Sequence, residues 1–298
     1  MEEIVLDFRR LTLDCVTPLR PYFEDNKCRI CDCTVGGTFI WRDYHRTEYA
    51  IADGVLFLKV AYPTPAFAPP RGLRAVKRAY ERIIEYCAKN NEPARLCSVS
   101  ATVLENVLKM FPGSDVQTNR DWSDYLYLSD DLINLAGRKY SGQRNHINHF
   151  LREHPTWSFD RITPDNVSGV RAYIERFARE FDKESSVYME GNRKALEVLD
   201  NLEVYRQFGG VLSVAGEIIG VSIGEITDDT LYVHAEKADT AYHGSYPMLM
   251  NQFAKRFAID GIRYINREED DGVEGLRVSK TSYHPVEMLD KYMVELKP

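Results

Sequence analysis

The chain has 298 residues and a formal net charge of -7, and 44% of its residues are hydrophobic. Because single hydrophobic cores rarely grow past roughly 250 residues, this length predicts two domains. The acidic balance excludes the diffuse basic surface of a general nucleic-acid binder. The N-terminal sequence MEEIVLDFRR has acidic residues where a signal peptide carries basic ones, and no apolar run approaches the roughly 20 residues of a membrane helix. We therefore expect a cytoplasmic protein with no transmembrane segment, and the sequence does not indicate an oligomeric state.

The first half of the chain is predicted to form a β-hairpin followed by alternating helices and strands. Thr47–Tyr62 has two alternating apolar runs around an Ala-Asp-Gly turn, which is typical of a hairpin. Apolar residues at helical spacing then predict a helix over Leu73–Ala88, and a strand follows at Ala94–Val99. A second amphipathic helix is expected over Val103–Phe111, and a strand at Asp124–Leu128 closes this half.

The six cysteines all lie in the first third of the chain, which is not the spread of a secreted disulfide framework. We therefore expect reduced thiols. Cys28, Cys31 and Cys33 form a C-x-x-C-x-C pattern that could bind a metal. However, no second cysteine pair at zinc spacing follows, and small apolar thiols suit a buried segment equally well. No metal is expected, and the role of this cluster stays open.

The second half repeats the element order of the first. The helices that precede it are clearest over 167–181, where apolar residues recur every three or four positions. The elements expected after them are a hairpin over Gly209–Ile226, a third strand over Thr230–Asp239, a helix over Tyr246–Ala258, a strand at Gly261–Asn266, a short helix near Val273–Ser279 and a closing strand at Lys291–Leu296. This shared order predicts a duplicated α/β fold with mixed sheets and right-handed βαβ crossovers. The predicted domains are residues 1–134 and 135–298.

Three blocks of sequence carry a resemblance to a known family. They are LAGRKYSGQRNHINHFLREHP (Leu135–Pro155), VHAEKAD (Val233–Asp239) and YINREEDDGVEGLRVSKTSYHP (Tyr264–Pro285). These blocks resemble the phosphatidylglycerol lysyltransferase C-terminal domain family, also known as DUF2156, and the element order is similar to the GNAT N-acetyltransferase fold. The resemblance implies two tandem GNAT-like domains. It does not fix a reaction. The first hypothesis is transfer of an acyl or aminoacyl group from coenzyme A or aminoacyl-tRNA to an amine or hydroxyl acceptor, and the cofactor is unknown.

A transferase of this class needs a base for the acceptor, a positioned donor and hydrogen-bond donors for the developing oxyanion. In GNAT-like sites, backbone amides at a helix N-terminus help to hold the donor. The matching turn here is Asp239–Pro247, with Tyr242, Gly244 and Ser245 as candidate binding residues. Its glycine content is low for acetyl-CoA binding, because enzymes of this fold typically have an Arg/Gln-x-x-Gly-x-Gly/Ala pattern there.

Glu236 and Lys237 are candidates on the third predicted strand. In a regular strand, His234, Glu236 and Ala238 point to one face, while Val233, Ala235 and Lys237 point to the other. Only one of Glu236 and Lys237 could then reach the site. A catalytic base at Glu236 and an exposed charge pair at a strand end are both open interpretations.

A basic block at residues 138–152 is predicted to be helical, with Ile147, Phe150 and Leu151 facing the core. Its candidate binding residues for phosphates of a donor are Arg138, Lys139, Arg144, Asn145 and His146. The alternative is a solvated helix face. His146 and His149 lack a matching carboxylate or thiol, so a zinc site is not expected there.

The charged stretch from Asn266 to Pro285 divides into two parts. Asp271 and Glu274 have the spacing of a cap for the following helix, with Arg277 and Lys280 toward its C-terminal end. The first part lies at the C-terminal end of a strand, where open α/β sheets place their ligands. The candidate binding residues of the whole stretch are Asn266, Arg267, Glu268, Arg277 and Lys280, and the candidate catalytic residues are Asp270 and Tyr283 together with Glu236. Two functions remain open: a transferase, and a ligand-binding or regulatory protein that keeps the fold without the chemistry.

Overall fold

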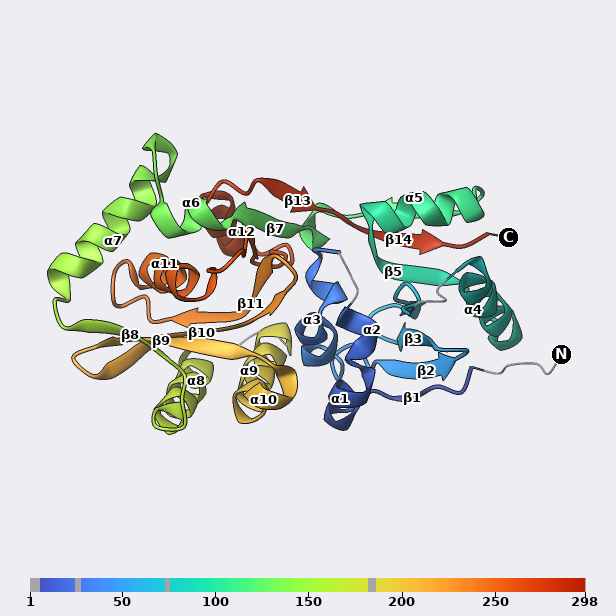
Figure 1. Cartoon of the computed structure of the whole chain (residues 1–298), viewed down its shortest axis with the longest axis horizontal. Coiled ribbons are helices and arrows are strands. Elements are labelled where there is room, and N and C mark those ends of the chain that lie inside the picture. Colours follow the sequence, from blue (N-terminus) through green and yellow to red (C-terminus); the bar gives the residue numbers. More distant parts are fainter. Residues whose placement is uncertain (1–5, 25–27, 73–75, 182–185, 298) are drawn as a thin grey trace. The chain divides into compact units, whose positions relative to one another are not determined.

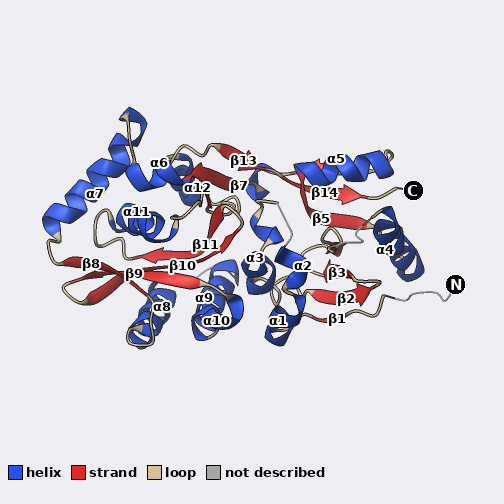
Figure 2. Cartoon of the chain, viewed as in Figure 1, coloured by secondary structure: helices blue, strands red, loops and turns tan. Residues whose placement is uncertain are grey.

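The computed structural model describes residues 6–24, 28–72, 76–181 and 186–297. The chain forms two compact units, one comprising Met1–Asp124 with Leu289–Pro298 and the other comprising Tyr125–Met288. Each of the two sheets has seven strands and mixes parallel with antiparallel pairs, and helices flank both sheets (Figures 1 and 2). Within the described ranges, no helix combines the length and the apolar character needed to cross a membrane.

The sheet of the first unit has the strand order β1-β2-β3-β4-β5-β14-β6. Its strands are β1 (Arg9–Arg10), β2 (Glu48–Ala52), β3 (Val55–Val60), β4 (Ala66–Phe67), β5 (Arg95–Ser100), β6 (Asp115–Thr118) and β14 (Lys291–Glu295). The helices are η1 (Leu13–Cys15), α1 (Val16–Leu19), α2 (Pro21–Glu24), η2 (Cys31–Cys33), α3 (Val35–Ile40), α4 (Lys77–Asn90), α5 (Ala101–Met110) and η3 (Arg120–Trp122). The predicted hairpin is β2–β3, and its turn places Asp53 and Gly54 at φ values of 51° and 74°, as a type I′ turn requires. The predicted helix start at Leu73 lies outside the described residues.

The sheet of the second unit has the order β13-β7-β12-β11-β10-β9-β8. Its strands are β7 (Asp124–Leu128), β8 (Trp157–Arg161), β9 (Phe208–Val214), β10 (Glu217–Thr227), β11 (Thr230–Ala238), β12 (Tyr264–Asn266) and β13 (Glu287–Leu289). The helices are α6 (Ser129–Asn134), η4 (Arg138–Tyr140), α7 (Ser141–Glu153), α8 (Val167–Phe181), α9 (Ser186–Asp200), α10 (Leu202–Tyr205), α11 (Ser245–Phe257) and α12 (Glu274–Thr281). Helix α11 packs on one face of β10 and α8 on the other (Figure 1). Tyr125, Leu231 and Phe253 are fully buried in the core beneath α11.

The closing strand of each predicted half lies in the sheet of the other unit. Strand β7 closes the first predicted half, but it pairs with β12 in the sheet of the second unit. Strand β14 closes the second predicted half, but it lies between β5 and β6 in the sheet of the first unit. The predicted domains follow chain order, whereas the compact units divide after Asp124 and exchange their closing strands. A local alternating pattern indicates that a strand exists, but it carries no information about the partner of that strand.

Helix α7 packs on the core through a narrower face than the sequence predicts. Ile147 and Phe150 are buried, as expected, together with Gln143. Leu151 is 37% exposed, so the inward orientation predicted for it is wrong. Residues 143, 147 and 150 centre the buried face, and Leu151 lies at its edge because it is rotated roughly 100° from Phe150 around the helix.

Candidate functional site

All the predicted site residues lie in the second unit, where the structure gathers most of them at two places. The first place is the C-terminal end of β12 with the loop that follows, which contains or contacts Glu236, Asn266, Arg267, Glu268, Asp270, Arg277, Lys280 and Tyr283. The second place is the turn before α11, which contains Tyr242, Gly244 and Ser245 and contacts His146. Arg138, Lys139, Arg144, Asn145 and Lys237 lie outside both groups.

Glu236 and Arg267 form an ion pair in which each side chain keeps one unused polar atom. Arg267 Nη2 donates to Glu236 Oε1 at 2.9 Å, and the two side chains are only 9% and 11% exposed. Among the described residues, neither Glu236 Oε2 nor Arg267 Nη1 has a hydrogen-bond partner, although both atoms are buried. Burial disfavours the charge of Arg267, but Glu236 outweighs that effect and the pKa of Arg267 is raised, so the guanidinium stays protonated. The pair therefore offers one carboxylate acceptor and one guanidinium donor to a polar ligand.

The surroundings of this pair combine aromatic rings with one small polar side chain. The Arg267 guanidinium lies 5.0 Å from the ring centroid of Tyr283 and 6.0 Å from that of Tyr127. Burial raises the pKa of Tyr283 to about 12, so its phenol stays protonated at neutral pH. Ser222 is the cross-strand neighbour of Glu236, and its buried Oγ also has no partner within the described part of the chain.

Strand β11 does not alternate regularly, which corrects one assumption about its side chains. The pairing with β10 shifts register between Ile223 and Gly224. As a result, Val233 and Ala238 both pack in the core beneath α11, although regular alternation puts them on opposite faces. Beyond the bulge, adjacent residues still diverge: Glu236 meets Arg267, while Lys237 Nζ lies 5.2 Å from the ring centroid of Phe177 on α8. Glu236 is therefore the residue that reaches the pair with Arg267.

Asp270 is fully buried and makes four hydrogen bonds. Its Oδ2 accepts from Tyr125 Oη at 2.6 Å and from Arg277 Nε at 3.0 Å. Its Oδ1 accepts from Arg277 Nη2 at 2.7 Å and from Gly272 N at 3.0 Å. Burial alone raises the pKa of Asp270, but these donors hold it well below its usual range. This arrangement favours a role in fixing the loop over a role as a proton acceptor, because its acceptor positions are already used.

The predicted cap of α12 by Asp271 and Glu274 is wrong. The helix begins at Glu274 with Val273 at the N-cap, and no side chain caps it there. Asp270 instead closes the turn before the helix, since its carbonyl accepts from Val273 N and its carboxylate accepts from Gly272 N. Asp271 has a φ of 50° and is exposed.

Two further predicted residues hold the backbone between β12 and Asp270. Lys280 Nζ donates to the carbonyl oxygens of Arg267, Glu268 and Glu269, at 2.6, 3.3 and 2.5 Å. The fully buried Asn266 accepts from Glu268 N at 2.6 Å. These contacts fix the left-handed conformation of Glu268, whose φ is 58°. Asn266 and Lys280 thus position the loop that carries Arg267.

A buried His234–glutamate cluster adjoins this loop, and sequence analysis missed it. His234 Nδ1 is 2.7 Å from Glu268 Oε1, and His234 Nε2 is 2.8 Å from Glu225 Oε1. Burial by itself lowers the pKa of His234, but the two carboxylates raise it to about 10. The imidazolium therefore bridges β11, β10 and the loop after β12. In the sequence, the only signal was a single histidine within an alternating strand pattern. His234 has two acidic partners only because the loop conformation brings Glu268 beside it.

The turn before α11 offers few amides for a phosphate. Ser245 N donates to Tyr242 O and Met248 N donates to Gly244 O, while Pro247 has no N–H. The Ser245 hydroxyl donates to Asp239 O at 2.7 Å, and Tyr242 Oη is 3.4 Å from Glu217 Oε2. These groups serve the turn itself, which disfavours the phosphate cradle found at many helix N-termini.

Gly244 is required at this turn for both its backbone conformation and its lack of a side chain. Its φ is 86°, and a Cβ atom there would lie 2.4 Å from His146 O on α7. We predict that Gly244→Ala lowers the free energy of unfolding by about 3 kcal/mol or more, since backbone strain and a steric clash both contribute.

Gly137→Ala is the matched control for this substitution. Gly137 has a φ of 82° with nothing within 4 Å of the added Cβ, so only strain of about 1–2 kcal/mol is expected. Urea unfolding of both variants measures the difference. Equal losses would show that α7 does not restrict this turn.

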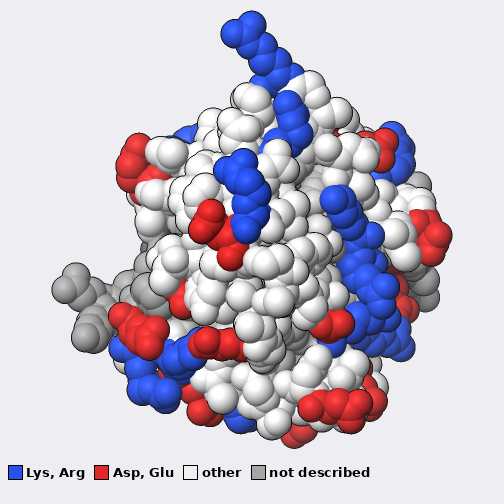
Figure 3. All heavy atoms as spheres, turned by 90° about the vertical axis from the view of Figure 1, so that its left-hand side faces the viewer, with Lys and Arg blue, Asp and Glu red and all other residues white. Residues whose placement is uncertain are grey.

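The basic block on η4 and α7 is largely a surface feature. Arg138, Lys139 and Asn145 are exposed, and Lys139 pairs with Asp131 at 3.1 Å. Arg144 instead donates to the carbonyl oxygens of Leu135 and Gly137, which follow α6. On the face shown in Figure 3, Lys and Arg side chains gather in a band beside a broad uncharged area. Arg144 is therefore engaged within the fold, while the exposed residues are available to an anionic partner.

Three histidines meet where α7 approaches the turn before α11. His146 Nδ1 lies 3.0 Å from His243 Nε2, and the rings of His149 and His243 are 4.6 Å apart. His146 thus joins this turn rather than the basic residues beside it in sequence.

The predicted cysteine cluster lies in the first unit beside an ion cluster. Lys291 Nζ on β14 is 2.6 Å from Asp32 Oδ2 and 2.8 Å from Asp124 Oδ1. Asp124 Oδ2 also accepts from Cys31 N at 2.6 Å. A hydrogen bond from Cys33 lowers the pKa of Cys28 to about 6, against the opposing effect of burial. Cys28 is therefore the more readily ionised thiol of that pair.

The chain is similar to one described protein family and to several solved structures. A family model described as phosphatidylglycerol lysyltransferase, C-terminal, matches residues 27–295. A conserved protein of unknown function from Bacteroides thetaiotaomicron VPI-5482 is 31% identical, and its crystal structure superposes with a TM-score of 0.90 over 98% of this chain and 100% of that chain. The C-terminal domain (DUF2156) of a putative lysylphosphatidylglycerol synthetase from Agrobacterium fabrum is 12% identical, with a TM-score of 0.69 over 94% of this chain and 90% of that chain.

A curated relative matches only in part. The uncharacterized protein MYCGA3080 of Mycoplasmoides gallisepticum (strain R(low / passage 15 / clone 2)) is 21% identical over 179 residues, which cover 58% of this chain and 56% of that protein. The chain thus spans about half the length of this relative. The predicted class, mixed α/β with two GNAT-like domains, is confirmed. The family match over residues 27–295 and the 31% identical relative together establish that the chain belongs to the phosphatidylglycerol lysyltransferase C-terminal family.

Proposed function

We propose that this protein transfers an aminoacyl group from an aminoacyl-tRNA to an amine or hydroxyl acceptor. The observation that carries this proposal is the Glu236–Arg267 pair, in which a carboxylate oxygen and a guanidinium nitrogen are buried beside each other without partners among the described residues. Buried polar atoms in folded proteins are nearly always paired, so two orphans within one ion pair favour a ligand-binding role. The pair also supplies a proton acceptor for the attacking group and a hydrogen-bond donor for the developing oxyanion, and acyl transfer requires both.

Glu236 and Arg267 have complementary roles in the proposed reaction. Glu236 Oε2 accepts the proton of the attacking amine or hydroxyl group, which makes it the general base. Arg267 Nη1 donates to the ester carbonyl oxygen as that oxygen becomes negative, which stabilises the tetrahedral intermediate. When the intermediate collapses, the ester C–O bond breaks, the aminoacyl group stays on the acceptor, and the tRNA ribose oxygen leaves as a hydroxyl group with the proton that Glu236 returns. Lys280 keeps Arg267 in place by donating to its carbonyl oxygen, and Asn266 holds the next residue by accepting from Glu268 N. Asp270 has a positioning role in this scheme, and Tyr283 supports the guanidinium with its ring.

The turn before α11 favours an aminoacyl ester over acyl-coenzyme A as the donor. The amides of Tyr242 and Ser245 and the Ser245 hydroxyl are engaged within the turn, and Gly244 is packed against His146 O, which leaves fewer donors for a pyrophosphate. The family description names a lysyltransferase, and the similar Agrobacterium fabrum domain comes from a putative lysylphosphatidylglycerol synthetase. Exposed Arg138 and Lys139 are suited to contact the tRNA phosphates.

A donor experiment tests the proposal. The protein is incubated with a pool of radiolabelled aminoacyl-tRNAs and, separately, with labelled acetyl-coenzyme A, each with phosphatidylglycerol vesicles, a small amine or no acceptor. We expect label to move from tRNA to one acceptor class and acetyl-coenzyme A to be inactive. Retention of a donor without any transfer would support the alternative of a non-catalytic ligand-binding protein, and failure to bind either donor would reject both.

Substitution at Glu236 tests the assignment of the base. Glu236→Asp keeps the charge but moves the carboxylate oxygen away from the acceptor, and we predict that it lowers the transfer rate by about 10–100-fold. Glu236→Gln removes the base, and we predict a decrease of roughly 10²–10⁴-fold. Donor binding should change little, because the base acts only in the transfer step. Glu217→Gln is the control, since Glu217 lies on the neighbouring strand β10 with a side chain that is 54% exposed. Unchanged transfer in a folded Glu236→Gln protein would remove Glu236 from the mechanism.

A further inference from the structure

A surface pocket of about 290 Å³ lies at the end of α11 in the second unit, and the proposed function does not use it. Its floor is the partly exposed ring of Phe208, which stacks on the buried Phe257 with centroids 4.4 Å apart and planes at 23°. Phe257 ends α11 and Phe208 begins β9. Across the sheet, Phe208 pairs with Gly224, two residues along β10 from Ser222, and the pocket lining contains neither Ser222 nor its neighbour Glu236.

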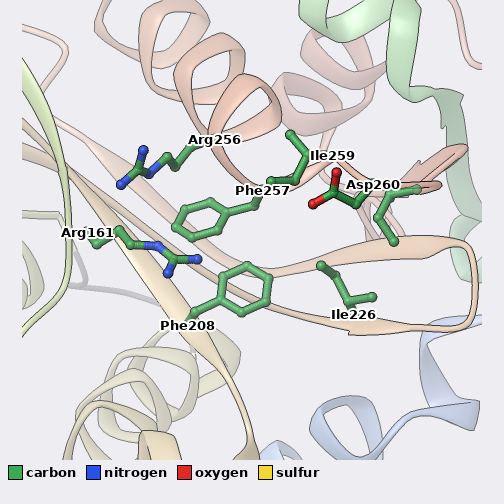
Figure 4. A pocket seen from close by; sticks show the side chains of 8 residues that line it. Arg161, Phe208, Ile226, Arg256, Phe257, Ile259 and Asp260 are labelled. Atoms are coloured by element: carbon green, nitrogen blue, oxygen red, sulfur yellow. The ribbon is translucent and has the colours of Figure 1, made fainter.

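Two arginines line one side of this pocket. The Arg161 guanidinium lies 4.9 Å from the ring centroid of Phe257, and Arg256 precedes Phe257 on the helix (Figure 4). Both are exposed, and within the described ranges neither forms an ion pair with a carboxylate. Two cations on one side of a pocket repel each other until an anion joins them.

The opposite side of the pocket is apolar apart from one carboxylate. Figure 4 shows Ile226 and Asp260 across the two phenylalanine rings from the arginines. Ile226 and Ile259 are 40% and 51% exposed, which leaves apolar surface for a ligand to cover. Asp260 is exposed and does not neutralise the arginines, so its charge would weaken the binding of an anion.

We propose that this pocket binds a small aromatic phosphate, with the phosphate between Arg161 and Arg256 and the ring against Phe208. Guanidinium groups recognise phosphate through paired charge-assisted hydrogen bonds. An aromatic ring gains both area burial and stacking on such a floor. The site uses none of the residues assigned to aminoacyl transfer. The experiments on this site therefore test it independently of that function.

Calorimetric titration of the full chain tests this site. Phenyl phosphate carries the proposed chemistry, while phenol and inorganic phosphate each carry half of it, and AMP adds a nucleoside. We expect saturable binding of phenyl phosphate that weakens with added salt, and weaker binding of phenol and of inorganic phosphate. Tighter binding of AMP than of phenyl phosphate would assign the site to nucleotides, and tighter binding of phenyl phosphate would assign it to smaller aromatic phosphates. No saturable binding of either would overturn the proposal.

Four variants locate the binding. The double substitution Arg161→Gln with Arg256→Gln should weaken phenyl phosphate binding by at least about tenfold. Lys255→Gln, on the same helix but outside the pocket lining, should leave it unchanged. Asp260→Asn should strengthen binding, a gain that damage to the fold does not produce, and Phe208→Leu should weaken binding of the ring while inorganic phosphate binding persists. Equal affinity in the double variant and the wild type would place the ligand elsewhere and reject the site.

Discussion

Asp270→Asn is expected to lower the free energy of unfolding by about 2–4 kcal/mol, because it removes the buried charged acceptor shared by Arg277, Tyr125 and Gly272 N. The Asp270 carboxylate joins Tyr125 on β7, Arg277 on α12 and the backbone of Gly272. An amide at this position cannot accept from all of them, since one of its two polar atoms is a donor. Chemical denaturation of the wild type and the variant measures the loss.

Asp271→Asn is the matched control for this experiment. The two residues are neighbours, but Asp271 is exposed, and asparagine tolerates its φ of 50°. We expect the control to lie within about 0.5 kcal/mol of the wild type. The pKa of Asp270 is depressed in the folded state, so its contribution is present above its unfolded pKa and is lost as the pH falls through the folded value. If both variants were equally stable, the hydrogen bonds to Asp270 would have no net effect on folding.

His234→Asn is expected to have a loss of similar size, on the order of 4 kcal/mol at pH 6, since the pKa of His234 rises from 6.5 to about 10 on folding. The substitution leaves the Glu225 and Glu268 carboxylates buried together without the cation that joins them. His146→Asn, at an exposed position on α7, is the control and should have little effect.

The pH dependence of this effect has a definite sign. Because the folded pKa of His234 is raised, its contribution is fully present below the unfolded value of 6.5 and is lost as the pH rises toward 10. The stability difference between wild type and variant should therefore shrink over that range. Nuclear magnetic resonance of the imidazole should show a protonated ring throughout pH 6–8, and a His234 titration midpoint near 6.5 would contradict the cluster.

The sequence predicted the elements of the site better than the contacts between them. Periodicity located β11 and α11 closely, and the position of Arg267 after a strand led to the prediction of a ligand-facing edge. The partners of Asp270 and His234 were not predictable in this way. They depend on a loop in which Glu268 and Asp271 adopt left-handed backbone conformations, and on a bulge in β11 that changes its facing residues. Neither feature has a periodic signature in the sequence. Asp270 and Arg277, which pair with each other, were therefore predicted as separate site residues.

The exchange of closing strands also bears on the order in which the protein folds during synthesis. Strand β14 lies between β5 and β6, and its Lys291 bridges Asp32 and Asp124, yet in chain order it follows every residue of the second unit. While the ribosome is still making the second unit, the first must therefore hold β5 and β6 without the strand that joins them. The second unit has β7 available from its beginning and can complete its sheet first. The half that is translated first is thus the half whose folding finishes last.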